Sequence, residues 1–549
     1  MNEKSAHIDG FAAANLPRPE MLPEIIFTRP ELQYPSRLNC VAELLDRAVA
    51  EGDGDRPAIL APGLRWSYAE LQDKVNRIAQ VLTEDLAIVP GNRVLLRAAN
   101  TPMLAACWLG VVKAGAIAVA TMPLLRAREL SWVIDKAEVA LAFCDGKLGE
   151  ELTGAQALSP RLSKIIHFGD GGGDSGGGEL EQRMAGKSGE FTAVDTSAED
   201  TCLIAFTSGT TGGPKGVMHC HRDVIAASDC FPPACIKATK DDIFCGSPPL
   251  AFTFGLGGLL LFPMRARAAV LLLEQASPDN LLAGIAEHKA SVLFTAPTGF
   301  RAMLDKLGDY DISSLRRCIS AGETLPKATF DAWYAATDLA IIDGIGSTEL
   351  LHIFISSADA DIRPGATGKV VPGYEARVID DDGIEVPPGE VGRLAVRGPT
   401  GCRYLRGEKQ ANYVENGWNV TGDAYRMDED GYFWFEARND DMIISAGYNI
   451  SGPEVEAALL EHASVAECAC VASPDEARGN IVKAFIVLRD GVECDAACIE
   501  GLQNFVKNQI APYKYPRAIE FVSELPKTGT GKMQRFRLRE MERERAAQT

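Results

Sequence analysis

The sequence predicts an α/β protein: a large N-terminal domain of layered α/β sheets with a small β-barrel-like subdomain, followed by a small, mobile α+β C-terminal domain. The chain has 549 residues, too many for one hydrophobic core, so at least two domains are expected. Segments of helical and strand period alternate through the first three quarters, which is typical of layered α/β architecture with largely parallel sheets. From residue 365 to 403, short strand-like runs alternate with Asp-Asp-Gly and Pro-Pro-Gly turns, which indicates a small antiparallel barrel or sheet.

Helices and strands can be assigned in order along the first part of the chain. Ser67 is a suitable N-cap for a helix over residues 68–82. A buried strand is predicted over 93–96, a helix over 103–113 and a second strand over 116–119. This strand–helix–strand order favours parallel pairing of the two strands.

Later segments differ in composition. Residues 251–264 form the longest apolar run, but glycines and a proline interrupt it, so it is too short and too broken to cross a bilayer. We expect a buried strand and turn there. Residues 169–178 are almost all glycine with aspartate and serine, which predicts a mobile surface loop. The strands expected in the antiparallel part cover residues 375–379 and 391–396.

The pattern changes again after Arg438. Asn439, Asp440 and Asp441 are polar and turn-prone, and about 110 residues follow them, enough for a small α+β domain. We therefore expect the N-terminal domain to cover residues 1–439 and the C-terminal domain to cover residues 440–549.

Charge and cysteine content exclude several classes of function. Acidic residues outnumber basic ones by 75 to 55, which gives a formal net charge of −20 and argues against a nucleic-acid partner. An anionic substrate must therefore be received by a local positive pocket. The polar stretch from Met1 to Gly10 lacks the features of a signal peptide, so a cytoplasmic protein without membrane association is expected. The 14 cysteines include no C-x-x-C pair, which predicts reduced, buried thiols.

The most informative stretch runs from Thr207 to Gly216 and combines hydroxyls and glycines with one lysine. Glycines let backbone N–H groups approach an anion, hydroxyls donate to its oxygens and the lysine adds a positive charge, so polyphosphate binding is predicted. The stretch departs from the Walker pattern, because Pro214 replaces a glycine and Gly216 replaces the hydroxyl that would hold magnesium. The predicted phosphate-binding residues are Thr207, Ser208, Gly209, Thr210, Thr211 and Lys215.

Two further clusters follow strand-like runs. Residues 320–323 (Ser-Ala-Gly-Glu) and 343–349 (Asp-Gly-Ile-Gly-Ser-Thr-Glu) are rich in small residues, which let a backbone pass close to a flat ligand. Thr348 then offers a donor to phosphate, and Glu349 offers a hard oxygen to Mg²⁺.

The last clusters lie toward the C-terminus. Asp423 and Arg438 provide a carboxylate and a guanidinium that suit ribose hydroxyls. Lys532 stands on a Gly/Thr-rich loop over residues 525–532, from which its ammonium reaches a distant site if the small domain swings. Each cluster alone is a weak signal, but their occurrence in this order within one chain is a strong one.

With these clusters in this order, the sequence resembles the adenylate-forming superfamily from about Leu38 to Leu538. The superfamily includes acyl-CoA synthetases, peptide-synthetase adenylation domains and luciferases. The resemblance implies an acid-CoA ligase that uses ATP, Mg²⁺ and coenzyme A in two half-reactions. A carboxylate first attacks the α-phosphate of ATP and expels pyrophosphate. The C-terminal domain then rotates, and the CoA thiol attacks the acyl-adenylate and releases AMP.

The resemblance also implies roles for individual residues. The N-terminal domain would bind ATP and the acid, while the C-terminal domain would carry the catalytic lysine and the CoA step. Lys532 would bridge the carboxylate and the α-phosphate, Thr348 would contact the α-phosphate and Glu349 the magnesium ion. The remaining roles are adenine contacts for Gly322, Glu323 and Asp343, ribose contacts for Asp423 and Arg438, a hinge at Asp440, and a CoA tunnel at Ser445, Gly447 and Tyr448.

The acid-binding region favours an aromatic substrate. Residues 249–257 resemble the acyl-pocket strand of the superfamily, with Phe252 in place of a histidine that many members carry. Residues 343–354 are very similar to benzoate-CoA and 2-aminobenzoate-CoA ligases. A short, flat pocket suits a single ring, and the hydroxyl of Thr253 favours an amino- or hydroxybenzoate, with 2-aminobenzoate as the single best prediction. The predicted lining residues are Thr253, Phe254, Ala321, Gly344, His352 and Ile353.

Several alternatives stay open. His352 either faces the substrate or is a hydrogen-bonded core histidine. Two alternatives to an aryl-CoA ligase stay open. One is a short- or medium-chain acyl-CoA ligase, and the other is a free-standing adenylation enzyme that loads a carrier protein, although no carrier domain follows in this sequence. His219, Cys220 and His221 have no further ligand near them in sequence, so a structural role is expected. The oligomeric state is open, with a homodimer as one alternative.

Overall fold

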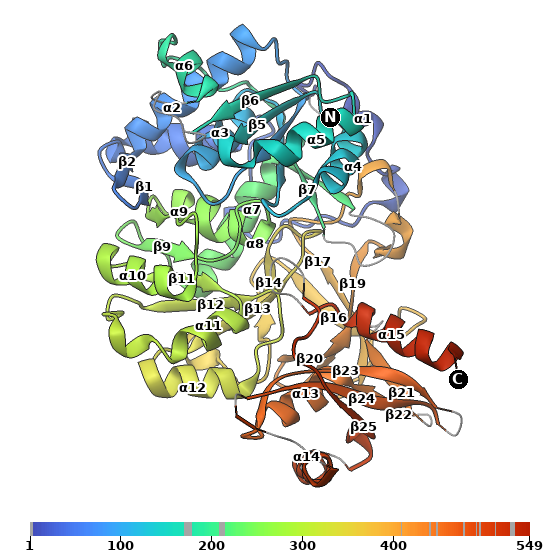
Figure 1. Ribbon diagram of the computed structural model, residues 1–549. Coiled ribbons are helices and arrows are strands. Elements are labelled where there is room, and N and C mark those ends of the chain that lie inside the picture. The colour runs from blue at the N-terminus through green and yellow to red at the C-terminus, as the bar shows by residue number, and fades with distance from the viewer. Residues whose placement is uncertain are drawn as a thin grey trace.

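The computed structural model of the protein describes residues 4–169, 178–207, 215–407, 409–438, 441–445, 448–475, 478–489, 491–492, 496–510, 512–527 and 533–548. Over these residues two large sheets follow one another from the top of Figure 1 downwards, and a smaller antiparallel sheet lies between them and the C-terminal elements. The fold class predicted from the sequence is confirmed.

The first large sheet is parallel except for its last pair, β7 and β8, which are antiparallel. Its central strands are buried along their whole length, as expected for a sheet covered on both faces. Its strands are, in spatial order, β6 (Lys164–Phe168), β5 (Leu141–Asp145), β3 (Arg93–Arg97), β4 (Ile117–Thr121), β7 (Thr201–Phe206) and β8 (Gly216–Cys220). The accompanying helices are α1 (Phe11–Ala14), α2 (Tyr68–Gln80), α3 (Pro102–Lys113), α4 (Ala127–Ala137), α5 (Gly149–Leu158), α6 (Glu179–Ala185) and α7 (His221–Phe231).

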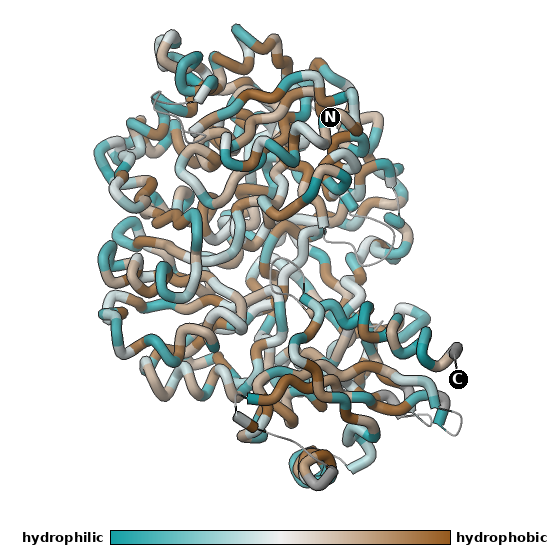
Figure 2. Tube along the Cα trace, viewed as in Figure 1, coloured by the Kyte–Doolittle hydropathy of each residue, from teal (hydrophilic) through white to brown (hydrophobic). Residues whose placement is uncertain are grey.

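The second large sheet is parallel in its centre, with antiparallel strands at both edges. Its strands are, in spatial order, β15 (Lys369–Val370), β14 (Ile353–Ser356), β13 (Ile341–Gly346), β12 (Arg317–Ala321), β11 (Val292–Thr295), β9 (Ile243–Gly246), β10 (Ala269–Leu271), β1 (Pro57–Ala61) and β2 (Leu64–Ser67). Helices α10 (Pro278–His288), α11 (Pro297–Leu304) and α12 (Lys327–Thr337) accompany it. Figure 2 shows apolar stretches concentrated in the strands of both sheets.

The antiparallel part follows, as the turn-rich sequence predicts. Its sheet holds β16 (Glu375–Ile379), β17 (Val391–Arg397), β19 (Trp418–Met427) and β18 (Val414–Glu415), with β20 (Phe433–Arg438) paired to β19. The C-terminal elements are β21 (Met442–Ser445), β22 (Tyr448–Ser451), α13 (Gly452–Leu460), β23 (Val465–Asp475), β24 (Gly479–Leu488), α14 (Ala496–Gln509), β25 (Ala518–Phe521) and α15 (Arg535–Gln548). Residues 439 and 440 lie outside the described residues, so the domain boundary stays a prediction.

The start of α2 shows how local sequence sets an element. The Ser67 hydroxyl accepts from the Glu70 N–H at 3.2 Å, and the Glu70 carboxylate accepts from the Ser67 N–H at 2.7 Å. This capping box satisfies two backbone donors that no helical carbonyl can reach. The predicted N-cap is therefore confirmed. The strands expected at 93–96 and 116–119 and the helix expected at 103–113 are also present.

One predicted element is wrong. Residues 251–264 are not a strand and turn but a nearly continuous helical segment, α8 (Thr253–Leu256), a π-helical stretch (Gly257–Leu261) and α9 (Phe262–Arg265). Its glycines allow close packing, because a Cβ on Gly257 would lie 2.3 Å from His352 Cδ2 and one on Gly258 2.5 Å from Phe294 Cδ1. The region that resembled an acyl-pocket strand is thus a loop that leads into a helix.

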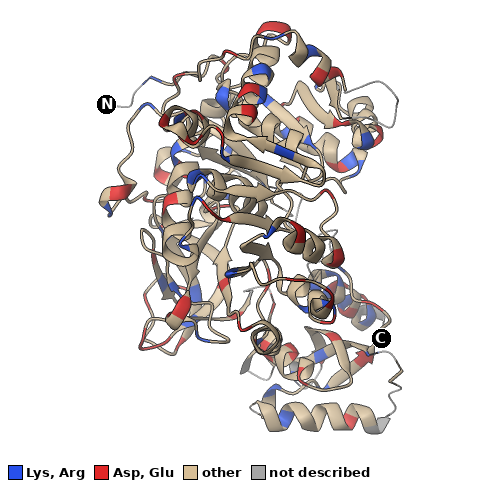
Figure 3. Ribbon diagram, turned by 90° about the vertical axis from the view of Figure 1, so that its left-hand side faces the viewer, with Lys and Arg blue, Asp and Glu red and all other residues tan. Residues whose placement is uncertain are grey.

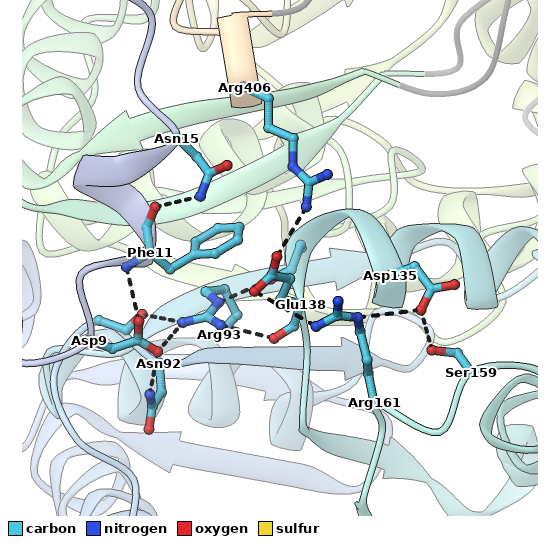
Figure 4. A network of polar contacts seen from close by, with 12 residues as sticks. Asp9, Phe11, Asn15, Asn92, Arg93, Asp135, Glu138, Ser159, Arg161 and Arg406 are labelled. Carbon is cyan, nitrogen blue, oxygen red and sulfur yellow. Dashed lines mark hydrogen bonds and ion pairs between the residues drawn. The ribbon is translucent and has the colours of Figure 1, made fainter.

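The N-terminal segment is tied to the first large sheet by the polar network in Figure 4. Arg93 on β3 forms an ion pair with Asp9, and its guanidinium also donates to the Glu138 carbonyl oxygen at 3.0 Å. The Arg93 guanidinium lies 4.1 Å from the centroid of the Phe11 ring. Arg406, far along the chain, donates to Glu138 Oε1 at 3.1 Å, so this network also holds the segment that follows β17.

The surface charges, the apolar character of the helices and the state of the cysteines bear on the expectations from composition, and only the cysteines depart from them. Acidic and basic residues are interspersed over the face shown in Figure 3. None of the described helices has the length and apolar character that crossing a membrane requires. The free cysteines within the described ranges are all buried, whereas Cys498 is disulfide-bonded, so the prediction of reduced thiols is wrong for that residue.

Candidate active site

The two ends of the predicted phosphate loop are held together by the chain itself. Strands β7 and β8 form an antiparallel pair in which Phe206 faces Gly216. The Thr207 N–H donates to the Lys215 carbonyl oxygen at 2.9 Å, and the Lys215 N–H donates to Thr207 Oγ1 at 3.3 Å. The loop therefore joins two strands, which differs from the strand–loop–helix of a Walker site. Ser208, Gly209, Thr210 and Thr211 lie outside the described residues.

The Thr348–Glu349 segment lies beside β8, the strand that begins at Gly216. The carbonyl oxygen of Thr348 accepts from His219 Nε2 at 2.7 Å, and Glu349 Oε1 accepts from the Tyr404 hydroxyl at 2.5 Å. Lys215 Nζ lies 4.9 Å from the centroid of the same Tyr404 ring. The structure thus brings Lys215, Thr348 and Glu349 together, although they lie far apart in sequence.

Glu349 has the properties that a magnesium ligand needs. Its Oε1 is engaged by Tyr404, while no described residue donates to Oε2. A carboxylate oxygen is the hard ligand that Mg²⁺ prefers. Glu349 Oε2, which no described residue engages, therefore fits a magnesium ligand.

Neighbouring strands bring the predicted adenine residues together. β12 and β13 pair in parallel, with Ser320 opposite Asp343 and Ala321 opposite Gly344. Gly322 and Glu323 follow β12 directly, so they leave the sheet at the same edge as the end of β13.

The predicted ribose residues face each other across a strand pair. Asp423 on β19 lies directly opposite Arg438 on β20, and the Asp423 N–H donates to Thr421 Oγ1 at 3.3 Å. Burial raises the pKa of Tyr413, and the negative charges of Glu349 and Asp423 add to this effect. The predicted ribose carboxylate and the predicted magnesium carboxylate therefore both act on one tyrosine.

Burial of Asp343 leads to a pH prediction. Burial raises the pKa of this carboxyl from 3.8 to about 7, against the opposing effect of the Gly344 N–H and the Ser320 hydroxyl. The folded protein then keeps a proton that the unfolded chain releases, so the stability from Asp343 is full below about pH 4 and is lost as pH rises through about 7. We expect the melting temperature of the protein minus that of Asp343→Asn to fall from pH 4 to pH 8 in scanning calorimetry. A difference that is constant over this range would contradict the raised pKa.

The predicted acid-binding residues form one connected cluster. His352, 3% exposed, lies among four phenylalanine rings. The centroid distances from His352 are 4.4 Å to Phe262, 5.7 Å to Phe231, 5.7 Å to Phe254 and 6.4 Å to Phe294.

The other acid-binding residues continue this cluster. Thr253 is buried at the start of α8, next to Phe254. Gly344 is so close to Ile353 that a Cβ on it would lie 2.8 Å from Ile353 Cγ2. Ala321 is the partner of Gly344 across the β12–β13 pair. Spatial contacts and adjacency in the chain therefore link all six predicted lining residues.

The His352 imidazole has a defined hydrogen-bonding state. Burial lowers the pKa of His352 to about 3, although contact with the Phe254 carbonyl opposes this effect. The ring is therefore neutral at physiological pH. Its Nε2 faces the Phe254 carbonyl oxygen at 3.4 Å, and because a carbonyl only accepts, the proton is on Nε2. Nδ1 is then an acceptor, and no described residue is its partner.

The residues predicted for the second half-reaction are only partly described. Ser445 is buried and its hydroxyl accepts from Arg478 Nε at 3.3 Å. Tyr448 pairs with Ser445 through the backbone of the β21–β22 hairpin. Asp440, Gly447 and Lys532 lie outside the described residues, so their roles stay predictions.

The His219–Cys220–His221 segment contacts more than the sequence suggests. His221 lies with Cys40 and Cys202, and donor atoms of these three buried residues lie within 4.8 Å of one another, so the premise that no further ligand is near is wrong. His221 Nδ1 nevertheless accepts from the Cys40 backbone N–H at 3.2 Å. Because this bond occupies the imidazole lone pair and a zinc site needs four ligands, the arrangement favours the structural role.

Comparison with known proteins decides the family. Residues 45–404 match the AMP-binding enzyme family, and residues 454–532 match the AMP-binding enzyme C-terminal domain. The chain belongs to the AMP-binding enzyme family. As a member of this family it is an adenylate-forming acid-CoA ligase that uses ATP and CoA.

Individual relatives of this AMP-binding enzyme include aryl- and acyl-CoA ligases. The benzoate–CoA ligase of Thauera aromatica is 35% identical over 93% of this chain and 98% of its own. The mouse (Mus musculus) mitochondrial acyl-coenzyme A synthetase ACSM3 is 32% identical over 87% of this chain and 84% of its own. The crystal structure of the anthranilate CoA ligase AuaEII with anthranoyl-AMP superposes with a TM-score of 0.89, at 35% identity, over 94% of this chain and 99% of that one.

Two residues of the candidate site, Tyr404 and His219, were not assigned to it from the sequence; Tyr404 was not singled out, and His219 was expected to be structural. Tyr404 and His219 contact Glu349 and Thr348 directly, yet neither stands in a segment rich in glycine or hydroxyl residues. A Tyr within a Gly-Cys-Arg-Tyr run has no local pattern that indicates an active-site role. These contacts become visible only in the structure, where the segment around Tyr404 pairs with β8.

Proposed function

We propose that this AMP-binding enzyme activates a benzoate that carries an amino or hydroxyl group beside the carboxylate, with 2-aminobenzoate as the preferred acid. The observation that carries the proposal is the buried His352, whose Nδ1 is an unpartnered acceptor inside a cluster of aromatic rings. An ortho amino or hydroxyl group is a donor and matches this acceptor, whereas plain benzoate offers none. The names of the similar benzoate and anthranilate ligases support the same class of acid.

In the proposed first step, an oxygen of the acid attacks the α-phosphorus of ATP and the bond to the β-phosphate breaks. Thr207, Lys215 and the hydroxyls of the loop between them hold the departing pyrophosphate. The Thr348 hydroxyl contacts the α-phosphate, and Lys532 bridges that phosphate and the attacking carboxylate. Magnesium, when bound at Glu349, would offset the negative charge of the phosphates.

The remaining residues hold the nucleoside and admit CoA in the proposed mechanism. Gly322, Glu323 and Asp343 frame the adenine, while Asp423 and Arg438 hold the ribose. In the second step the CoA sulfur attacks the acyl carbonyl carbon and the bond to AMP breaks. We propose that the chain from residue 440 onward rotates about Asp440 between the steps, and that Ser445, Gly447 and Tyr448 then line the approach of CoA.

A screen of pyrophosphate release tests the substrate class. The acids are benzoate, 2-aminobenzoate, 4-hydroxybenzoate, butyrate and octanoate, each measured with and without CoA. The proposal predicts the highest kcat/KM for 2-aminobenzoate. Turnover of octanoate well above every benzoate would instead support the alternative of a short- or medium-chain acyl-CoA ligase. Turnover without any CoA thioester would support loading of a carrier protein.

His352→Phe isolates the proposed hydrogen bond. Phenylalanine keeps an aromatic ring in the cluster but removes the acceptor. We expect the ratio of kcat/KM for 2-aminobenzoate over benzoate to fall about tenfold, since leaving a buried donor without its acceptor costs about 1–3 kcal/mol. Benzoate serves as the internal control, because its own kcat/KM should change little. An unchanged ratio would show that His352 does not select the ortho group.

A further inference from the structure

Tyr404 contacts both sides of the proposed triphosphate site. Its hydroxyl donates to Glu349 Oε1 at 2.5 Å, and Lys215 Nζ lies 4.9 Å from the centroid of its ring. The side chain is 1% exposed. One buried side chain therefore links the lysine at the end of the phosphate loop to the acidic residue at the end of the 343–349 segment.

The position of Tyr404 is fixed without help from Glu349. The Tyr404 N–H donates to Gln410 Oε1 at 2.9 Å, and the residue forms an antiparallel bridge with Val217 on β8. Its ring packs edge to face against Tyr413, with the ring centroids 5.7 Å apart. Contacts that do not involve Glu349 therefore fix the position of the Tyr404 ring and hydroxyl.

The residues on either side of Tyr404 are anchored to the first large sheet and its helices. Arg403 forms an ion pair with Asp223 on α7 at 2.5 Å, and Asp223 is fully buried. Arg406 donates to Glu138, the residue that ends α4, as Figure 4 shows. Glu349, in contrast, lies between β13 and β14 of the second large sheet. Tyr404 thus connects a segment anchored to the helices of the first large sheet with Glu349, which belongs to the second large sheet.

We propose that Tyr404 is a positioning residue that holds Glu349 and Lys215 in register for the magnesium–triphosphate of ATP. This inference rests on the roles proposed above for Glu349 and Lys215. A donor on Oε1 orients the carboxylate and leaves Oε2 for the metal ion. The aromatic face of Tyr404 attracts the Lys215 ammonium without neutralising its charge, so the ammonium stays available to phosphate oxygens. A carboxylate partner would instead compete with the phosphate for this ammonium. None of the described carboxylates forms an ion pair with Lys215, in keeping with this role.

Tyr404→Phe tests the proposal, because it removes only the hydroxyl and keeps the ring over Lys215. We expect the Mg²⁺ concentration for half-maximal pyrophosphate release to rise roughly tenfold to a hundredfold, the loss expected for a hydrogen bond to a charged group. The KM values for the acid and for CoA should not change. Without turnover, Mn²⁺ binding to the enzyme with a non-hydrolysable ATP analogue, followed by electron paramagnetic resonance, should weaken by a similar factor.

Tyr34→Phe is the matched control. The Tyr34 hydroxyl donates to a different carboxylate, Asp229 Oδ2, at 3.0 Å, so the Mg²⁺ dependence of this variant should match that of the unmodified enzyme. If Tyr404→Phe lowers stability or kcat while Mg²⁺ and Mn²⁺ dependence stay unchanged, the proposal is overturned. If Glu349→Gln also leaves the Mg²⁺ dependence unchanged, the assignment of Glu349 fails instead, and the two failures are therefore distinguishable.

Discussion

Replacing Glu349 by glutamine is expected to slow acyl-adenylate formation by about a hundredfold or more, the range found when one group that stabilises transition-state charge is removed. Glutamine has nearly the same shape, but its amide is neutral and presents one oxygen, so it is a poor magnesium ligand. Its carbonyl oxygen can still accept from the Tyr404 hydroxyl, which protects the local fold. The measurement is acid-dependent pyrophosphate release in single turnover, with Mg²⁺ varied.

The same experiment needs a control for lost charge alone. Glu287 has a side chain that is 73% exposed, so Glu287→Gln removes one negative charge far from the proposed site. It should leave adenylate formation unchanged. If both variants keep full activity at limiting Mg²⁺, another residue holds the metal ion.

Lys532→Ala is expected to abolish adenylate formation while sparing the second half-reaction. Lys532 itself lies outside the described residues, but the chain before residue 528 and the chain after residue 532 contact each other. The Gln534 N–H donates to the Pro526 carbonyl oxygen at 2.8 Å, and Lys527 forms a bridge with Met533. An ammonium that bridges the carboxylate and the α-phosphate offsets charge only in the first step, so its loss should not affect attack by CoA.

The two steps are measured separately for this variant. Pyrophosphate release reports adenylation, and conversion of a supplied aryl-adenylate with CoA to the thioester reports the second step. Lys507→Ala, which alters a lysine that hydrogen-bonds to Asn504 on α14, is the control and should affect neither. Equal loss of both steps in Lys532→Ala would contradict the role proposed for this lysine.

Local signals in the sequence predicted most elements because local interactions determine them. The Ser67 cap and the strand predicted at 93–96 depend on residues that are neighbours in the chain. Residues 251–264 were misassigned because an apolar run carries no period that distinguishes a buried helix from a strand. Its glycines, which suggested a break, instead allow the helix to pack against His352.

The candidate site likewise has residues that local sequence patterns predict and residues that only the fold brings into place. The residues proposed to contact ligands from small, glycine-rich turns, such as those around Thr348, leave a pattern in the sequence. Tyr404 reaches Glu349 only because β8 pairs with the chain near Arg403, which brings the tyrosine there from a distant segment. The pKa values of Asp343 and His352 likewise follow from burial, which composition and spacing do not reveal.

The central claim, that this acid-CoA ligase activates an ortho-substituted benzoate, is tested most directly by internal competition. Equal concentrations of 2-aminobenzoate and octanoate are offered with ATP, Mg²⁺ and limiting CoA, and the two thioesters are quantified by mass spectrometry. Their ratio equals the ratio of the two kcat/KM values, because both acids compete for the same free enzyme. We predict that 2-aminobenzoyl-CoA forms in large excess. An excess of octanoyl-CoA would contradict the claim.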